Sequence, residues 1–307
     1  IIYNKVIELK PNSPKVYNNV GNILHDLDRR EEAIINLNKA IELRVDYAEA
    51  HYNLARVFQT YKNYEEAIVS YNKAIELKSD YAEAFNNLGN ILHALGKYEE
   101  ASSQFTRAIE IKPDYAAAFN NLGTSLNKLR RYEEAIASFN KVIELKPNHA
   151  GAYNNLGASL NTFSKYEGAI KSFRKAIELQ PDYAEAYNNL ATLTQGQGDT
   201  NLAIQYFNKA LSLKPSYPEA HYNLGLAFSD INEFDSAVQS YNKALSLKPS
   251  YPEVYNSLAT IISQQGNTDE AIKLFNKAIL LKPDYSEAYF NICLLYTSPS
   301  PRDQRGS

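Results

Sequence analysis

Apolar residues recur along this chain at the spacing of short amphipathic helices. In residues 82–115, large apolar side chains three or four residues apart stand at Phe85, Leu88, Leu92 and Leu95. This spacing places them on one face of a helix, because an α-helix has about 3.6 residues per turn. Gly96 follows directly, and glycine adopts at little cost the left-handed conformation that ends many helices. The pattern predicts a first helix that ends before Gly96.

A second helix is predicted in the other half of the same stretch. Its apolar side carries Ala101, Phe105, Ala108 and Ile109, with Tyr98 at the start. Pro113 ends it, since proline cannot continue a helix. Small residues on both helices, Gly89 among them, leave room for a close approach, and the phenylalanine rings fill the space between the helices.

Aspartates that precede the first helices are predicted to cap them. Asp80 stands three residues before Glu83, and Asp182 stands three residues before Glu185. A polar side chain before a helix can accept a hydrogen bond from the first turn, and a glutamate three residues later can return one. Both pairs therefore predict capping boxes. After Asp114 the matching residue is an alanine, so the box there is incomplete.

The whole pattern recurs every 34 residues. With residue 82 as position 1, complete copies run over 14–47, 48–81, 82–115, 116–149, 150–183, 184–217, 218–251 and 252–285. Position 8 is always glycine or alanine, and position 20 is alanine in every copy. The departures are mild, and they stand at Val45, Ser79, Val142 and Thr194. One pair of helices cannot bury its apolar faces alone, so neighbouring copies must complete the core.

In these features the chain resembles the tetratricopeptide repeat (TPR) family. That family has bulky residues at positions 4, 7, 11 and 24, small residues at positions 8, 20 and 27, and proline at position 32. Nearly the whole chain fits this pattern. The resemblance implies an all-α fold: a right-handed α-α superhelix, or TPR solenoid, of helix-turn-helix repeats.

The two ends of the sequence break the repeat. Residues 1–13 correspond to the second helix of a truncated repeat, and the chain holds no methionine, so we expect no translation start at residue 1. Residues 286–292 open a ninth repeat. Residues 293–307 follow no repeat pattern and resemble a translated sequencing adapter, so we expect a non-native tail, with a natural disordered tail as the alternative. Cys293, the only cysteine, is given no redox or catalytic role.

Two styles of repeat follow one another along the chain. Up to about residue 190, second helices favour a Tyr-Glu-Glu-Ala start and an Ile-Glu-Leu end. Later second helices lack the Tyr-Glu-Glu-Ala start, and two of them end with Leu-Ser-Leu, at 211–213 and 245–247. Because no linker separates the styles, we interpret them as separate duplication histories within one continuous array. A domain boundary there is the alternative.

Composition narrows the classes of partner. The chain has 44% hydrophobic residues, 22% charged residues and a formal net charge of −3. This balance gives no reason to expect nucleic acid or an acidic membrane surface as the partner. No apolar run approaches the roughly 20 residues that a membrane-spanning helix needs. The cytoplasm is the expected compartment.

Catalytic and metal-binding patterns are absent from the sequence. The five histidines stand at repeat positions 4, 12 and 34, and no two are four residues apart, the spacing that places two metal ligands on one helix face. Acidic pairs that start second helices, such as Glu99-Glu100, suit the positive end of the helix dipole. We therefore expect that this chain is not an enzyme and that it holds no cofactor and no metal.

One polar row is not explained by packing. Position 6 carries the same residue in seven complete repeats, namely Asn19, Asn53, Asn87, Asn121, Asn155, Asn189 and Asn223. On a helical wheel this position lies opposite the buried positions 4, 7, 8 and 11. A carboxamide donates and accepts hydrogen bonds, so it can hold a peptide backbone whatever its side chains. We predict a peptide-binding row. The alternatives are a neutral residue copied by duplication or a brace between helices, and the frequent asparagine at position 5 favours them.

The row also resembles the asparagine ladder in the TPR region of O-linked N-acetylglucosamine transferases and their SPINDLY-type relatives. There, such asparagines hold extended protein substrates for a C-terminal glycosyltransferase domain, which these residues do not include. Another TPR groove binds the C-terminal carboxylate of heat-shock chaperones through basic residues. Lys15 and Arg56 are basic groove residues, but they do not reproduce that clamp. We therefore expect no chaperone carboxylate clamp.

Three expectations follow from these features. The first is a non-catalytic protein–protein interaction scaffold that binds extended peptide segments in its concave groove. The alternative is the substrate-recruiting TPR region of a larger enzyme similar to an O-linked N-acetylglucosamine transferase. A third possibility is assembly, because repeats cut at both ends expose apolar faces. End-to-end association of this chain would then be an artefact.

Overall fold

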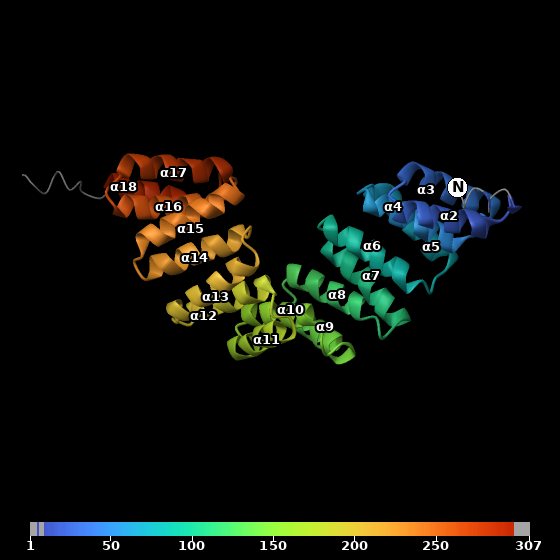
Figure 1. The fold of residues 1–307 in the computed structure, drawn as a ribbon, viewed down its shortest axis with the longest axis horizontal. Helices are drawn as coiled ribbons and strands as arrows, with labels where there is room; N and C mark the ends of the chain where they lie inside the picture. The colour runs from blue at the N-terminus through green and yellow to red at the C-terminus, as the bar shows by residue number, and fades with distance from the viewer. Residues whose placement is uncertain (1–4, 6–8, 298–307) are drawn as a thin grey trace, which may run out of the picture. The chain divides into compact units, whose positions relative to one another are not determined.

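The computed structural model describes residue 5 and residues 9–297 of the chain. All regular secondary structure in this part of the chain is α-helical (Figure 1). The first helices of the repeats are α2 (Pro14–Asp26), α4 (Ala48–Thr60), α6 (Ala82–Ala94), α8 (Ala116–Lys128), α10 (Ala150–Thr162), α12 (Ala184–Gly196), α14 (Pro218–Asp230), α16 (Pro252–Gln264) and α18 (Ser286–Thr297). The second helices are α3 (Arg30–Leu43), α5 (Tyr64–Leu77), α7 (Tyr98–Ile111), α9 (Tyr132–Leu145), α11 (Tyr166–Leu179), α13 (Thr200–Leu213), α15 (Phe234–Leu247) and α17 (Thr268–Leu281). The predicted all-α fold of helix-turn-helix repeats is confirmed.

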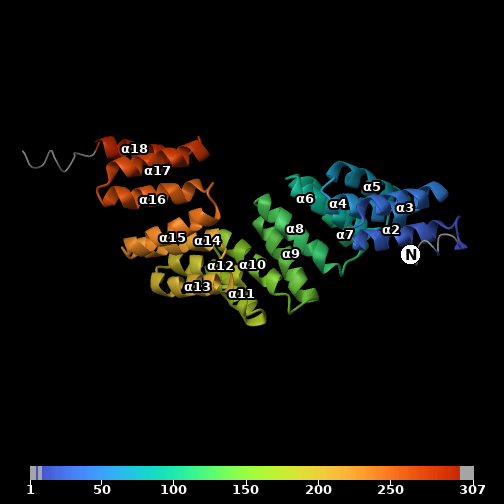
Figure 2. The ribbon, with the colours of Figure 1, turned by 45° about the horizontal axis from the view of Figure 1, so that its top comes forward.

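The chain forms two compact units, residues 1–163 and residues 164–307. Within each unit, every helix packs on the next one along the chain, so each unit is a stack of helical hairpins (Figure 1, Figure 2). The division falls between the two helices of repeat 150–183. The change of repeat style near residue 190 lies inside the second unit, where α12 and α13 pack closely on each other.

The turn between the two helices of a repeat contains one left-handed residue, at position 15. Its φ is positive at Asp28, Lys62, Gly96, Arg130, Ser164, Gly198, Asn232 and Gly266. Gly96 has a φ of 77° and follows the end of α6 as predicted. The other residue types strain this conformation, because a Cβ lies too close to the following carbonyl oxygen. The packing of the flanking helices therefore fixes the turn even where no glycine is present.

The predicted capping boxes are wrong. The N-cap of the first helices is position 34, which is Tyr81 before α6 and Tyr183 before α12, and neither caps through its side chain. Asp80 stands one residue too early to act as the cap, and its carbonyl oxygen accepts from the N–H of Ala82 at 3.2 Å. Side chains do cap helices at His149, Asp199 and Asn267.

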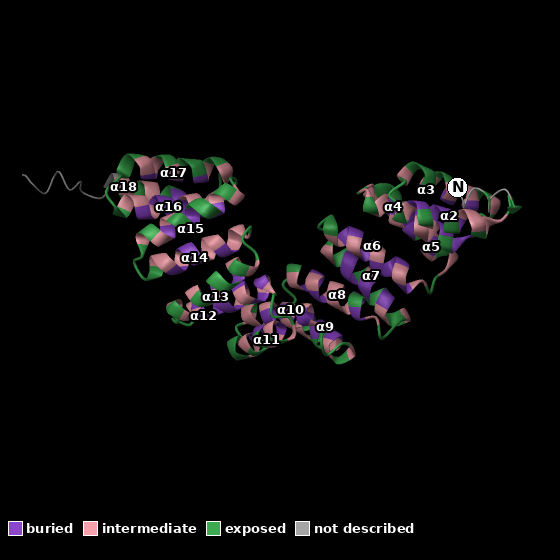
Figure 3. Ribbon diagram, viewed as in Figure 1, coloured by how far each residue is buried: buried purple, intermediate pink, exposed green. Residues whose placement is uncertain are grey.

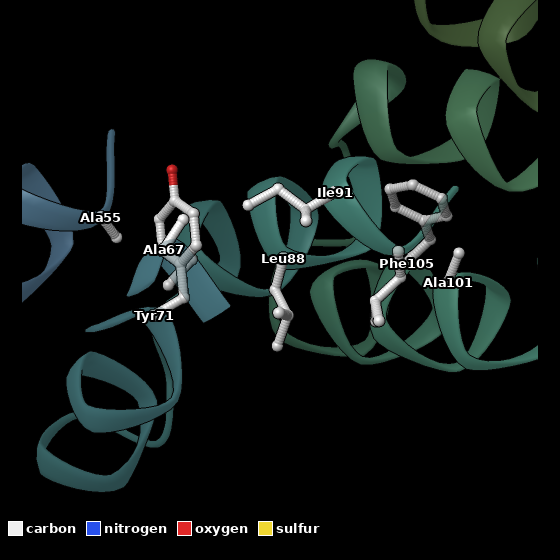
Figure 4. Packing of buried hydrophobic residues seen from close by; sticks show 9 residues of the cluster. Ala55, Ala67, Tyr71, Leu88, Ile91, Ala101 and Phe105 are labelled. Carbon is white, nitrogen blue, oxygen red and sulfur yellow. The ribbon is translucent and has the colours of Figure 1, made fainter. Parts of the chain in front are cut away.

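Small residues let the helices approach closely, as predicted. The alanines of position 20, from Ala33 to Ala271, are all 0% exposed. A Cβ added to Gly89 would lie 2.6 Å from Cε1 of Phe105, closer than van der Waals contact allows. Tyr71 of one repeat and Phe105 of the next belong to one cluster (Figure 4). Buried positions line the helix contacts and exposed ones follow the outer turns, so within each unit the core runs on from repeat to repeat (Figure 3).

The helix α18 extends beyond the residues that were predicted to open the ninth repeat. It runs to Thr297, and Cys293 stands at position 8, where the complete repeats have glycine or alanine. Phe290 and Leu294 are 62% and 45% exposed on this last helix. The non-native tail stays a prediction, and its residues 298–307 lie outside the described part of the chain. The same holds for most of the first eight residues, which were assigned to a truncated repeat.

Candidate peptide-binding face

The asparagines of position 6 lie on the first helices of the repeats, on the side opposite the buried glycine or alanine of position 8. Asn53, Asn87, Asn121, Asn155, Asn189 and Asn223 are half-buried, and Asn19 is exposed. Ser257 takes this position on α16, and Asn291 takes it on α18. The row therefore reaches the surface along one side of each stack, where a ligand could touch it.

Five position-6 asparagines among the described residues donate a side-chain hydrogen bond to the position-5 asparagine of the preceding repeat. The pairs, from Nδ2 to Oδ1, are Asn53 to Asn18 at 2.9 Å, Asn121 to Asn86 at 3.1 Å, Asn155 to Asn120 at 3.2 Å, Asn223 to Asn188 at 3.1 Å and Asn291 to Asn256 at 3.1 Å. Donor and acceptor are 35 residues apart in every pair. The bond therefore links one repeat to the next.

The acceptors of these bonds are mostly buried. Asn18, Asn86, Asn188 and Asn256 are 7%, 5%, 6% and 3% exposed. A buried carboxamide left without a partner would cost about 1–3 kcal/mol, so the bond from the next repeat has a structural purpose. Of the alternatives that the sequence left open, a brace between helices is present.

The brace uses only part of each position-6 amide. A carboxamide has two N–H donors and an oxygen with two lone pairs. Among the described residues, no hydrogen bond reaches Oδ1 of Asn53, Asn121, Asn155 or Asn223. Asn121 uses both of its N–H donors, since Nδ2 also donates to Oδ1 of Asn90 at 2.9 Å. Each of these oxygens remains able to accept a hydrogen bond from a ligand.

Two repeats replace the position-5 asparagine by tyrosine, and we call these positions the tyrosine rungs. At Tyr52, the hydroxyl accepts a hydrogen bond from Nδ2 of Asn87 at 3.1 Å. At Tyr222, the hydroxyl lies 3.5 Å from Oγ of Ser257. The ring of Tyr52 stacks on that of Tyr81 at 4.8 Å, and the ring of Tyr222 lies 5.3 Å from that of Tyr251. Both rings of each pair belong to the same repeat, so aromatic packing holds the tyrosine of the rung in place within its own repeat.

A charged corner that the sequence analysis did not predict borders the asparagine row. In repeats 82–115, 184–217, 218–251 and 252–285, position 31 is a lysine whose ammonium lies over the tyrosine ring of position 34 and near the glutamate of position 2. For Lys112, Nζ is 5.1 Å from the ring centroid of Tyr115 and 3.6 Å from Oε1 of Glu83. The same corner forms at Lys214, Lys248 and Lys282. Positions 2 and 6 are neighbours on a helix face, so each corner lies beside the row.

The tyrosines of these corners hold their protons tightly. Burial, followed by the charge of the nearby glutamates, raises the pKa of Tyr115, Tyr217 and Tyr251 to about 12. They are therefore neutral hydrogen-bonding groups at ordinary pH. The sequence signal for this corner is the recurrence of glutamate, lysine and tyrosine at positions 2, 31 and 34. A helical wheel did not reveal it, because a wheel shows one helix at a time and these positions do not share a helix.

The histidines show no metal-binding arrangement. Among the described residues there is no group of three or more His, Cys, Asp or Glu side chains that could hold a metal ion. Nδ1 of His93 lies 2.8 Å from Oγ of Ser125 in the next repeat, so this histidine joins repeats as the asparagines do. Burial, and then the charge of Lys128, lower its pKa. His93 is thus a neutral hydrogen-bonding residue at neutral pH.

Basic residues do not gather on this face. Nη1 of Arg56 donates to Oδ1 of Asn22 at 3.0 Å, so its guanidinium is engaged in joining α2 and α4. Lys15 is exposed at the start of α2. In addition, none of the helices in the described residues has the length and apolar character needed to cross a membrane.

Family models match most of this chain. The description "TPR repeat" applies to residues 21–60, 62–96 and 89–129, and the description "Tetratricopeptide repeat" applies to 116–149, 148–216, 182–250 and 232–293. The chain belongs to the tetratricopeptide repeat family. Among the curated proteins, no match to it was found.

Solved structures share the fold. The chain resembles the "APC/C hetero-tetramer Cut9-Hcn1" with a TM-score of 0.68 and 16% identity, over 87% of this chain and 52% of that one. It resembles a structure titled "Functional Characterization of Pseudomonas Aeruginosa pilF" with a TM-score of 0.60 and 20% identity, over 69% and 96%. YrrB, titled "a TPR protein with an unusual peptide-binding site", matches with a TM-score of 0.47 and 24% identity, over 61% and 96%. At these identities the first two likenesses concern the fold alone.

Proposed function

We propose that this chain is a non-catalytic protein-interaction scaffold whose first-helix face binds extended segments of partner proteins. The observation that carries the proposal is the asparagine row, in which the amides of Asn53, Asn121, Asn155 and Asn223 donate to the preceding repeat and keep an oxygen that can accept another bond. A fixed carboxamide loses little side-chain freedom on binding, which favours affinity. TPR arrays serve as binding surfaces for proteins and peptides, which supports the choice of ligand class.

The spacing of the row fits an extended polypeptide. Neighbouring helices pack about 8–10 Å apart. About three residues of an extended chain span that distance, at about 3.1–3.3 Å per residue. A peptide that runs along the row can therefore present a backbone N–H to each position-6 asparagine that it passes. Because the contacts are to the peptide backbone, we expect binding that tolerates many peptide sequences, with selectivity supplied by the charged corners and the tyrosine rungs.

A displayed library of short random-sequence peptides tests the proposal. We expect selected peptides to bind the whole chain, and the variant with Asn53→Ala, Asn121→Ala and Asn155→Ala, all in the first unit, to bind them roughly a hundredfold more weakly. That factor follows from three lost hydrogen bonds of about 1 kcal/mol each. The readout is fluorescence polarisation of a labelled selected peptide, with circular dichroism to verify the helical content.

A matched control is available on the other side of the helical hairpins. Asn72, Asn140 and Asn208 are exposed asparagines at position 25 of the second helices. Changing these three to alanine removes as many carboxamides and should leave peptide affinity unchanged. If the two triple variants bind the peptide equally well, the row does not bind peptides and the proposal fails.

The alternative is a substrate-recruiting region of a larger enzyme similar to an O-linked N-acetylglucosamine transferase. It is supported by the same asparagine row and by no separate feature of the described residues. Sequencing of the gene past the codon for Ile292 separates the two: a glycosyltransferase domain there would favour recruitment, and further repeats or a stop codon would favour the scaffold.

A further inference from the structure

Among the complete repeats, two of the aromatic rings at position 24 of the second helices carry a hydroxyl and five do not. The tyrosines are Tyr71 and Tyr241, and the phenylalanines are Phe105, Phe139, Phe173, Phe207 and Phe275. A Cβ added to Gly225 would lie 3.1 Å from Cζ of Tyr241. One added to Gly89 would lie 2.9 Å from Cζ of Phe105. The two rings therefore face the first helix alike, and a hydroxyl on Phe105 would point as that of Tyr241 does.

The tyrosine hydroxyls lie where the first helices of two successive repeats meet. That of Tyr71 donates to Oε1 of Gln59 at 2.6 Å, and the side chain of Asn87 lies beside it. Gln59 stands at position 12 of the same repeat, and Asn87 stands at position 6 of the next. Ser257, at position 6 of α16, lies beside the hydroxyl of Tyr241. The hydroxyl of position 24 therefore reaches the position-6 row.

A small crevice lies at the matching place in repeat 82–115. It has a volume of about 110 Å³ and is lined by Asn90 and His93 of α6, Phe105 of α7, and Asn121 and Thr124 of α8. The ring of Phe105 (Figure 4) is 1% exposed, so it forms the floor, and the four polar residues are half-buried. A water molecule takes about 30 Å³, so the crevice has room for more than a hydroxyl.

Two carboxamides of the crevice are bonded to each other, and each keeps an unpaired group. Nδ2 of Asn121 donates to Oδ1 of Asn90 at 2.9 Å and to Oδ1 of Asn86 at 3.1 Å. Within the described part of the chain, Nδ2 of Asn90 donates no hydrogen bond and Oδ1 of Asn121 accepts none. Neither atom is buried, so a ligand can reach both. The crevice therefore offers one donor group and one acceptor on neighbouring side chains.

These two groups decide which side chain fits. A carboxylate can accept from Asn90, but it has no donor for Oδ1 of Asn121. The attraction of Lys128 for a carboxylate is weak, because this lysine is exposed and water screens its charge. An ammonium is disfavoured, since the charge of Lys128 already reaches His93. An aliphatic side chain would leave both groups unpaired. A carboxamide accepts and donates, so it satisfies both.

The matching places beside the other phenylalanines lack the pair of carboxamides. Position 9, which is Asn90 here, carries Thr124, Ala158, Thr192 and Thr260 in the repeats of Phe139, Phe173, Phe207 and Phe275. No carboxamide stands beside the position-6 residue at these places. The arrangement of an unpaired donor and an unpaired acceptor on two bonded carboxamides beside a phenylalanine is therefore a property of the crevice between α6 and α8.

We propose that this crevice is a side-chain pocket of the peptide-binding face and that it takes the carboxamide of an asparagine or glutamine in the bound partner segment. The inference rests on the proposed function, because Asn121 belongs to the position-6 row. The oxygen of the bound carboxamide accepts from Nδ2 of Asn90, and its nitrogen donates to Oδ1 of Asn121. That oxygen has two lone pairs, so it can accept from the peptide backbone as well.

Selection of the random-sequence peptide library on the unchanged chain and on Phe105→Tyr tests the pocket. The added hydroxyl fills part of the crevice, as those of Tyr71 and Tyr241 do in their repeats. We expect Asn or Gln to be enriched at one peptide position on the unchanged chain and not on the variant, which still binds peptides along the rest of the row. Phe207→Tyr, the same change beside Thr192, should keep the enrichment. Circular dichroism verifies the helical content.

Fluorescence polarisation then compares a selected peptide with two copies in which the enriched residue is replaced by glutamate or by leucine. Both copies should bind the unchanged chain about tenfold more weakly, because each leaves at least one group of the crevice unpaired. Asn90→Ala removes the donor and keeps the crevice open, so it should bind the three peptides within about threefold of one another. A glutamate or leucine copy that binds the unchanged chain as tightly as the selected peptide would contradict the choice of ligand.

The outcomes separate this inference from the proposed function. Peptides that are selected without enriched Asn or Gln, or an enrichment that Phe105→Tyr keeps, would overturn the pocket and leave the peptide-binding row standing. Failure to select any peptide on the unchanged chain would overturn the proposed function, and the pocket with it.

Discussion

Two neighbouring repeats in the first unit join to the next repeat through different acceptors. In repeat 82–115, the buried amide of Asn86 accepts a hydrogen bond from Asn121 at 3.1 Å. In repeat 48–81, the hydroxyl of Tyr52 accepts one from Asn87 at 3.1 Å. The donor is an asparagine of position 6 in both. Because the link persists when the acceptor changes, a neutral residue copied by duplication does not account for the row.

The two repeats differ in what else holds the link. The ring of Tyr52 lies 5.7 Å from that of Tyr71 and 4.8 Å from that of Tyr81, so aromatic packing supports it. Asn86 has no ring, and it depends on its hydrogen bonds to Asn87 and Asn121. The tyrosine rung is therefore expected to be stabilised chiefly by packing, and the asparagine rung chiefly by hydrogen bonding.

The largest expected effect comes from removing the aromatic support of the tyrosine rung. Tyr71 is 0% exposed and its hydroxyl donates to Gln59 at 2.6 Å. Tyr71→Ala should lower the free energy of unfolding by about 3–5 kcal/mol, because it leaves a large cavity. Tyr71→Phe, which keeps the ring, should cost about 1 kcal/mol for the lost hydrogen bond. Urea titration followed by circular dichroism measures both, and equal costs would contradict the role given to packing.

Double-mutant cycles compare the two links directly. Asn86→Ala with Asn121→Ala, and Tyr52→Phe with Asn87→Ala, should each give a coupling energy of about 0.5–1.5 kcal/mol, the usual contribution of one hydrogen bond. The single change Asn121→Ala should cost more than Asn87→Ala, because it leaves the more deeply buried acceptor unpaired. Coupling near zero in both cycles would mean that the brace contributes nothing to stability.

The turns of the same two repeats also differ, and changing them is expected to have a smaller effect on the free energy of unfolding. Repeat 82–115 has Gly96 at the left-handed position, with φ of 77°, and repeat 48–81 has Lys62 there, with φ of 60°. Lys62→Gly should raise the free energy of unfolding by about 1 kcal/mol at most, since relief of the Cβ strain is partly offset by the greater freedom of glycine in the unfolded chain. Gly96→Ala should lower it by about the same amount. Thermal unfolding shows the signs, and a loss on Lys62→Gly would mean that the lysine side chain stabilises the turn.

A separate effect, confined to alkaline conditions, is a dependence of stability on pH. Burial raises the pKa of Tyr115 and of Tyr251 from 10.0 to about 12. A raised pKa in the folded state stabilises the protein fully below pH 10, and this contribution is lost as the pH rises towards 12. The melting temperature should therefore fall over that window. The double variant Tyr115→Phe, Tyr251→Phe should show a shallower fall, and an identical pH profile would remove these tyrosines as the cause.

The sequence predicted the helices and their packing well, because both depend on the 34-residue pattern. Gly89 against Phe105 and the alanines of position 20 lie as expected. The capping boxes failed because the turn places Tyr81, not Asp80, at the N-cap. A helical wheel showed which face Asn121 occupies, but it could not show that Asn86 of the preceding repeat is within reach. Links of this kind depend on the register between helices, which a single-helix pattern does not contain.

The central claim is that the position-6 row both braces the repeats and binds peptide, and two sets of variants separate these roles. Asn53→Ala, Asn121→Ala and Asn155→Ala remove the donors. Asn18→Ala, Asn86→Ala and Asn120→Ala remove their acceptors and leave the row intact.

The deciding measurement is the affinity of a selected, labelled peptide for the two triple variants, made alongside their unfolding curves. Both sets should lose stability, because each breaks the same three links. The donor set should also lose roughly a hundredfold in peptide affinity, and the acceptor set should stay within about threefold of the unchanged chain, because its row can still bind the peptide. Equal losses of affinity in the two sets would contradict the claim, since they would show that the row acts on the peptide only by holding the repeats together.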